Sequence, residues 1–221
     1  KKFFNTNDIY LFHLLINDIY FSIKNLKWID KFNYLSIYTP MPNEIINPTS
    51  MTYDIINKDN CIFKKGESNW YSNTISEKGI IFNSKNKVIG FEFTILNEYK
   101  NYIIGFSQKH KDYSSCFVNI DYSFYLLDNN NILIYELASD KGNYGKYKKN
   151  DKFQIIYDYI SNTIIYLHNY KEIYKSFIKC NNDIEYFVDI SLYNDNCSIT
   201  DLKWITINEI NKKKSYRCEI Q

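Results

Sequence analysis

Acidic residues that could hydrolyse a glycosidic bond are the first chemical possibility in this sequence. Retaining enzymes use two carboxyl groups about 5–5.5 Å apart for this reaction. Glu92 stands in Gly-Phe-Glu-Phe-Thr without a second acid two or four positions later. Asp183 and Glu185 share a face of a predicted strand, but their surroundings favour solvated edge charges. The acids therefore do not predict a glycosidase.

Motifs for other kinds of catalysis are missing as well. The sequence has no Gly-x-Ser-x-Gly motif, and His13, His110 and His168 lie in unrelated local contexts. The turn Asp128–Asn131 has one carboxylate, whereas Ca²⁺ normally needs more oxygen ligands of this kind. The sequence therefore predicts no enzyme, no metal site and no cofactor.

The cysteines bear on the compartment rather than on catalysis. They are Cys61, Cys116, Cys180, Cys197 and Cys218, an odd number with wide spacing and no Cys-x-x-Cys pair. This spacing argues against a zinc site. We interpret them as free thiols, which favours an intracellular location over secretion. The alternative is one or two disulfides in a secreted protein, with Cys180 and Cys197 as the best local pair.

Two predicted loops carry side chains that suit molecular recognition. Residues 67–73 present a tryptophan and a tyrosine, which can stack on a sugar or anchor a protein partner. Residues 108–115 mix lysine, histidine and tyrosine. The candidate ligand-binding residues are Trp70, Tyr71, Lys109, His110 and Tyr113. The competing interpretation of Trp70 is a core side chain.

Short strands must position these loops, because alternating apolar and polar residues dominate from Asn60 to Thr206. Within Val88–Leu96, for example, Phe91, Phe93 and neighbouring isoleucines fall on one face of a strand. Polar turns separate such stretches, as at 128–131 and 158–162. The pattern predicts a mainly β protein, an antiparallel two-sheet β-sandwich or jelly roll.

The N-terminal part has a different period. Between residues 8 and 32 the apolar positions recur every three or four residues, which is typical of helices. These positions are Ile9, Phe12, Ile16, Ile19, Ile23, Leu26 and Ile29. A strand around Ile19–Ile23 is the alternative. Prolines at 40, 42 and 48 then indicate an extended connector. We expect a helical N-terminal extension at 1–40, a connector at 41–59, the sandwich at 60–210 and a basic C-terminal tail at 211–221.

Five stretches, in their order along the chain, resemble strands of the concanavalin A-like lectin/glucanase superfamily. The closest likeness is to its laminin-G-like and SPRY-like modules. The stretches are Gly90–Phe93 with Ile104–Ser107, Ile120–Leu126, Ile132–Glu136, Gly145–Ile155 and Thr163–Asn169. The resemblance implies a fold shared by lectins, glycosidases and protein-binding modules, and the fold alone does not choose among them. Tyr170 stands where the usual turn has glycine, which predicts strain there.

A second resemblance concerns the N-terminal segment. Residues 8–29 have the cadence of an F-box, three short helices that dock on an adaptor of a ubiquitin ligase, although the leading Leu-Pro is missing. This resemblance implies a substrate receptor.

Composition narrows the partners further. The net charge is +2, from 27 basic and 25 acidic residues, so charge does not indicate nucleic acid or an anionic membrane. No apolar run reaches the roughly 18 residues of a membrane span. The abundance of Asn, Ile, Lys and Tyr is typical of AT-rich genomes, and we expect a eukaryotic parasite as the source. We expect a non-catalytic interaction module that recognises a protein partner through sandwich loops. The alternatives are a carbohydrate-binding, lectin-like adhesin domain and an F-box-like receptor.

Overall fold

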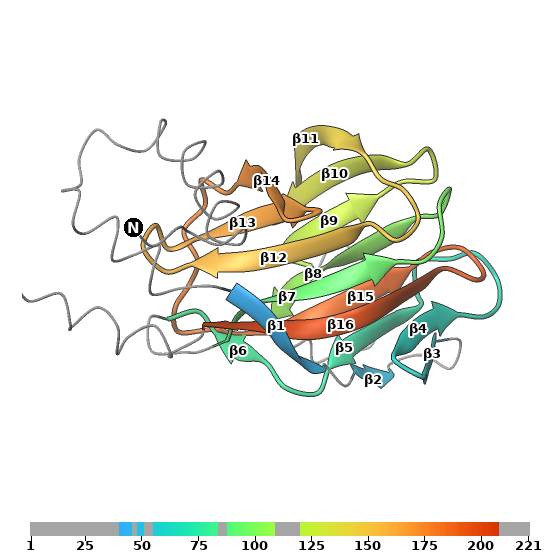
Figure 1. The fold of residues 1–221 in the computed structure, drawn as a ribbon, viewed down its shortest axis with the longest axis horizontal. Helices are drawn as coiled ribbons and strands as arrows, with labels where there is room; N and C mark the ends of the chain where they lie inside the picture. Colours follow the sequence, from blue (N-terminus) through green and yellow to red (C-terminus); the bar gives the residue numbers. More distant parts are fainter. Residues whose placement is uncertain (1–39, 46–47, 51–54, 84–87, 109–119, 208–221) are drawn as a thin grey trace, which may run out of the picture. The chain divides into compact units, whose positions relative to one another are not determined.

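The computed structural model describes residues 40–45, 48–50, 55–83, 88–108 and 120–207. The regular secondary structure of these residues is all β-strand, arranged in two sheets (Figure 1). Every strand pair with a defined register is antiparallel. Within the compact unit Met41–Thr206 the sheets enclose one hydrophobic core, which confirms the predicted β-sandwich.

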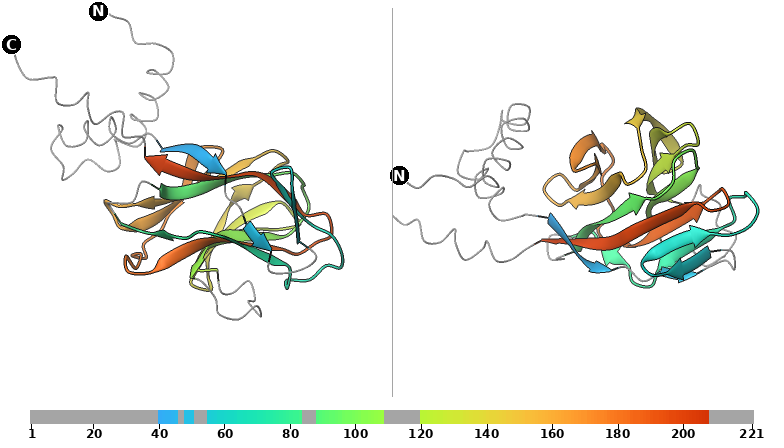
Figure 2. Two further views of the ribbon diagram at one scale, coloured as in Figure 1. Left: turned by 90° about the horizontal axis from the view of Figure 1, so that it is seen from below. Right: turned by 45° about the vertical axis from the view of Figure 1, so that its right-hand side comes forward.

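Each sheet has eight strands. Sheet A has the order β14-β13-β12-β7-β16-β4-β3, with β1 paired to β16. Its strands are β1 (Pro40–Ile45), β3 (Ile55–Lys58), β4 (Cys61–Lys64), β7 (Val88–Ile95), β12 (Lys152–Asp158), β13 (Thr163–His168), β14 (Lys171–Lys175) and β16 (Ser198–Ile207). Sheet B has the order β11-β10-β9-β8-β15-β5-β2, with β6 paired to β15. Its strands are β2 (Pro48–Ser50), β5 (Asn73–Ser76), β6 (Ile80–Ile81), β8 (Tyr102–Gln108), β9 (Tyr122–Leu126), β10 (Asn131–Glu136), β11 (Ser139–Lys146) and β15 (Glu185–Leu192). Figure 2 shows the two layers from other sides.

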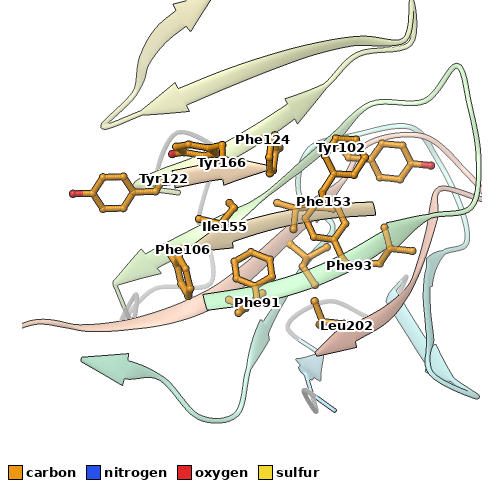
Figure 3. Close-up of a cluster of buried hydrophobic side chains, with 14 of the residues drawn as sticks. Phe91, Phe93, Tyr102, Phe106, Tyr122, Phe124, Phe153, Ile155, Tyr166 and Leu202 are labelled. Atoms are coloured by element: carbon orange, nitrogen blue, oxygen red, sulfur yellow. The ribbon is translucent and has the colours of Figure 1, made fainter. Parts of the chain in front are cut away.

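Alternation along each strand builds the core. In β7, Phe91, Phe93 and Ile95 are fully buried members of the core cluster, as their spacing predicted. Phe93 stacks on Phe153 of β12 with ring centroids 5.4 Å apart, and Phe124 of β9 meets Phe153 edge-on at 5.0 Å. These rings join the two sheets (Figure 3). Aromatic contacts of this geometry add to the stabilisation from burial.

Two predicted turns lie where they were predicted, within one residue of the predicted bounds. β12 ends at Asp158 and β13 begins at Thr163, and the β13–β14 turn contains Asn169 and Tyr170. Both of these residues have positive φ, 50° and 64°. A two-residue hairpin turn of this kind favours Asn followed by Gly. Tyr170 therefore adopts a left-handed conformation that favours glycine, and this is the position at which the sequence predicted strain.

The predicted connector at 41–59 contributes strands to the sandwich. It contains most of β1 and all of β2 and β3, and these pair with β16, β5 and β4 respectively. Pro40 and Pro48 each occupy the first position of a strand, where a missing N–H donor is tolerated. The prolines thus correctly indicated an extended backbone, but they did not indicate that this backbone pairs with strands of the two sheets.

Several sequence predictions lie outside the described residues. They are the N-terminal helices and their F-box likeness, the C-terminal tail, and Cys116 and Cys218. The three described cysteines, Cys61, Cys180 and Cys197, are free thiols. Burial raises the pKa of Cys197 to about 11, which keeps that thiol protonated and unreactive. Within the described ranges no helix has the length and apolarity to cross a membrane.

Glu136 is a carboxyl group buried between the sheets. Its Oε2 accepts hydrogen bonds from Ser176 Oγ at 3.0 Å and from Tyr174 OH at 3.4 Å. Within the described part of the chain, Glu136 Oε1 and the nearby Tyr166 hydroxyl have no hydrogen-bond partner. Burial raises the pKa of Glu136, although the hydrogen bonds from Ser176 and Tyr174 act in the opposite direction. Folding therefore shifts the Glu136 carboxyl toward its protonated form relative to the unfolded chain.

Changing Glu136→Gln is expected to remove a pH dependence of stability. A carboxyl whose pKa is higher in the folded state stabilises the fold fully below its unfolded pKa, and this contribution is lost as the pH rises through the folded pKa. The unfolding free energy of the wild type, relative to the variant, should therefore fall as the pH rises above the unfolded pKa of glutamate, about 4.3, as measured by urea titration. Glu77→Gln, at an exposed site, should keep the wild-type profile. Parallel profiles for the wild type and Glu136→Gln would contradict the prediction.

Candidate recognition surface

The loop that carries Trp70 and Tyr71 is held by a buried lysine. Lys64, the last residue of β4, is 0% exposed. Its Nζ donates to the carbonyl oxygens of Asn69 and Tyr193, each at 2.9 Å, and to Asn69 Oδ1 at 3.3 Å. A buried ammonium is stable only when such acceptors replace its water. Lys64 therefore fixes the path of the chain just before Trp70.

Asn69 adds hydrogen bonds both within the loop and between the loop and Tyr193. Its backbone N–H donates to Tyr193 O at 3.0 Å. Its side-chain Oδ1 accepts from the Tyr71 backbone N–H at 3.0 Å and from Ser72 Oγ at 3.1 Å. The loop is thus tied both to itself and to the segment after β15. This bonding presents Trp70 and Tyr71 in a defined orientation.

Four aromatic rings lie together beside this loop. Trp70 packs against Tyr193 at 4.9 Å and meets Tyr125 edge-on at 5.7 Å, and Tyr125 meets Tyr135 at 5.5 Å. All four are half-buried, while Tyr71 is 71% exposed. We call Trp70, Tyr71, Tyr125, Tyr135 and Tyr193 the aromatic surface.

The aromatic surface lies on the outer side of sheet B. Tyr125 alternates with Phe124 and Leu126, which belong to the core, and Tyr135 alternates in the same way with Ile134. Trp70, predicted as either a core or a binding residue, is not a member of the core cluster and covers the Tyr125 ring. Trp204 is in the core.

The hydroxyl group of Tyr125 remains neutral. Burial raises the pKa of Tyr125, and the neighbouring Tyr135, Asp128 and Tyr193 raise it further. A neutral phenol can both donate and accept a hydrogen bond. The surface therefore combines apolar ring area with polar tips, which suits a ligand that has both characters.

The other three predicted ligand-binding residues, Lys109, His110 and Tyr113, lie outside the described residues. The strand ends that flank them are described. Gln108 pairs with Tyr186, whereas at the other end of β8 Tyr102 pairs with Leu126 and Leu192, next to Tyr125 and Tyr193. Their segment therefore begins at the end of β8 opposite the aromatic surface. That they share one site with Trp70 stays a prediction.

Lys64, Tyr125, Tyr135 and Tyr193 were not among the predicted site residues. A signal existed for Lys64, because it follows Ile62 at the next inward-facing position of an alternating strand. Tyr125 and Tyr135 likewise occupy outward positions of predicted strands. Their contact with Trp70 is a long-range feature that local spacing does not contain.

Of the acidic residues considered for catalysis, Glu92 has structural partners. Glu92 lies buried on the outer side of sheet A, where Gln154 Nε2 donates to it at 2.7 Å and Lys152 Nζ lies 3.4 Å away. Asp183 and Glu185 are exposed. Among the residues that the structure describes, no three His, Cys, Asp or Glu side chains gather where they could hold a metal ion.

No protein family model and no curated protein matches this sequence. Solved structures share its fold. A human SPRY domain aligns with a TM-score of 0.52 at 12% identity, covering 68% of this chain and 94% of that domain. The Emp46p carbohydrate recognition domain has a TM-score of 0.52 at 8% identity and covers 83% and 93%. The TRIM65 PSpry domain has a TM-score of 0.51 at 8% identity and covers 78% and 96%. The concanavalin A-like, SPRY-like fold is confirmed, and at these identities the likeness extends to the fold alone.

Proposed function

We propose that this chain is a non-catalytic binding module that recognises a protein partner through the aromatic surface. The observation that carries this proposal is the loop held by Lys64, which presents an exposed Tyr71 beside the packed rings of Trp70 and Tyr193. Trp and Tyr dominate the binding energy of protein interfaces because they offer large, rigid contact areas with hydrogen-bonding tips.

Preorganisation supports the same function. Ordering a rotamer-rich side chain on binding costs about 0.5–1.5 kcal/mol, and the rings of Trp70, Tyr125 and Tyr193 are already packed before a partner arrives. Within the aromatic surface, Tyr71 is the one ring that lies largely in solvent. A partner can therefore bury Tyr71 against a surface that needs little rearrangement.

Carbohydrate is the second candidate ligand. The faces of the rings of Trp70 and Tyr71 suit the apolar side of a sugar ring, and the neutral hydroxyl of Tyr125 suits sugar hydroxyl groups. The shared fold with the Emp46p carbohydrate recognition domain is compatible with it. An F-box-like receptor role for the N-terminal segment stays a prediction.

Changing Tyr71→Ser is expected to weaken partner binding about tenfold or more, because an exposed aromatic anchor at an interface contributes about 2 kcal/mol. We would select peptides from a phage-displayed random library on the wild-type chain and measure the affinity of each for both proteins. A glycan array would be probed in parallel.

Phe177→Ser is the matched control, since Phe177 is an exposed aromatic residue in a different turn, after β14. It should leave the affinity for the selected peptides unchanged. Equal peptide affinities for the wild type and Tyr71→Ser would remove the aromatic surface as the site. Glycan binding without peptide binding, lost in Tyr71→Ser, would transfer the proposal to carbohydrate.

A further inference from the structure

Two exposed carboxylates border the aromatic surface. Asp140 of β11 is paired with Tyr135 of β10, so the two side chains are neighbours on the outer side of sheet B. Asp128 lies in the turn that follows β9. The pKa of the nearby Tyr125 hydroxyl is raised first by burial and then by neighbours that include Asp128. We call Asp128 and Asp140 the acidic border of the aromatic surface.

The negative charges of the acidic border are not neutralised by neighbouring lysines. Among the residues that the structure describes, no lysine forms an ion pair with Asp128 or Asp140. Lys146 Nζ reaches the turn that carries Asp128, but there it donates to Asn129 O at 2.8 Å. Both carboxylates are therefore available to a positively charged group from outside the chain.

The Asp140 carboxylate is held in place by its own strand. Its Oδ1 accepts a hydrogen bond from the Gly142 backbone N–H at 2.7 Å. Gly142 has a φ of 113°, in a region of the backbone map that favours glycine. Within the described part of the chain, the other oxygen of Asp140 accepts no hydrogen bond. The fold therefore orients this carboxylate beside Tyr135 and leaves one of its oxygens to an external donor.

Tyrosine rings beside unpaired carboxylates suit a cation, and arginine in particular. A guanidinium group can stack on a tyrosine ring and donate two parallel hydrogen bonds to a carboxylate. The ammonium group of lysine is a compact point charge that lacks this planar face. An acidic segment would be repelled by both carboxylates. An apolar segment would remove water from them without offering a hydrogen bond in return.

We propose that the partner segment bound by the aromatic surface places an arginine side chain beside Tyr125 and Tyr135, where the acidic border accepts hydrogen bonds from its guanidinium group. This inference rests on the proposed function, because it names the chemistry of the segment that the aromatic surface binds. Tyr71 then supplies the exposed ring that the partner buries. The two carboxylates select a basic segment and speed its association with the surface.

Peptides selected on the wild-type chain from the phage-displayed random library are the probes that test this proposal. They should share an arginine. Replacing that arginine by citrulline, which keeps its shape but removes its charge, should weaken binding about tenfold, as measured by isothermal titration calorimetry. The double variant Asp128→Asn/Asp140→Asn should weaken binding of the arginine peptides to a similar extent. Its affinity for the citrulline peptides should equal that of the wild type, because both changes remove the same interaction.

Glu77→Gln is the matched control, since it removes a negative charge from an exposed position in the turn between β5 and β6. It should leave the affinity for the arginine peptides unchanged. The double variant should keep the urea midpoint of the wild type, because both acids are exposed and the introduced amide oxygen can still accept from the Gly142 N–H. A change in binding can then be assigned to the lost charges.

The outcomes separate this inference from the proposed function. Selected peptides that bind Tyr71→Ser more weakly but share no arginine, or that tolerate citrulline, would overturn the inference and leave the proposed function standing. Equal affinity of peptides with lysine in place of arginine would also overturn it, because a point charge would then suffice. Peptides that bind Tyr71→Ser as tightly as the wild type would remove both.

Discussion

Replacing Lys64 with alanine is expected to lower the unfolding free energy by about 3 kcal/mol and to abolish binding through the aromatic surface. The change removes a charged donor at a fully buried position and takes one hydrogen bond from the Asn69 carbonyl oxygen, while Tyr193 O keeps the hydrogen bond from the Asn69 backbone N–H. Each buried acceptor left unpaired costs about 1–3 kcal/mol. The loop before Trp70 would then lose its anchor. Urea unfolding measures the first effect, and the affinity for peptides selected on the wild type measures the second.

Lys65→Ala is the control for this experiment, because Lys65 is the next residue and is exposed. It should change stability by less than about 0.5 kcal/mol and leave binding intact. Lys64→Met adds a test of the cause, since it keeps most of the side-chain volume but donates no hydrogen bond. If Lys64→Met matches the wild type in stability, packing rather than hydrogen bonding holds the loop.

Replacing Phe124 with alanine should cost about 3–5 kcal/mol, the largest loss of stability that we expect from a single truncation. Phe124 is fully buried, and its ring contacts Phe153 at 5.0 Å, Tyr166 at 5.3 Å and Phe93 at 6.2 Å. The three partners come from β7, β12 and β13 of sheet A, so the cavity would open between the sheets. The midpoint of urea unfolding should fall while its slope stays constant.

Tyr99→Ala removes an aromatic ring of similar size from an exposed position and is the matched control. It should change the unfolding free energy by less than about 0.5 kcal/mol. A loss below about 1 kcal/mol for Phe124→Ala would mean that the two sheets are not joined through this cluster.

The sequence was most informative where local pattern and final burial coincide. Alternation placed Phe91 and Phe93 on the core face of β7, and the polar stretch 158–162 contains the turn between β12 and β13. Gly105 lies in one of the stretches that carried the family resemblance. Glycine is needed at this position because a Cβ there would lie 2.1 Å from Tyr122 O on the adjacent strand. Such features depend on strand geometry and on nearest neighbours, which the local sequence encodes.

The site depended on contacts that no local pattern contains. Lys64 bonds to Tyr193, which is 129 residues away, because β4 pairs with the start of β16 and Tyr193 lies in the segment that joins β15 to β16. The same topology brings Trp70 to Tyr125 and Tyr193. The strands at 40–58 were also missed as strands, since proline at the first position of a strand resembles proline in a connector.

The hydrogen bonds by which Lys64 holds the loop go mainly to backbone carbonyl groups. Among the described residues it donates to two main-chain carbonyl groups, which every amino acid provides, and to the Asn69 side chain. Most residues of the loop between Lys64 and β5 can therefore be substituted in evolution without loss of the hydrogen bonds that Lys64 donates to it. The loop can therefore acquire a new binding specificity through new side chains alone, while the contacts that support it stay the same.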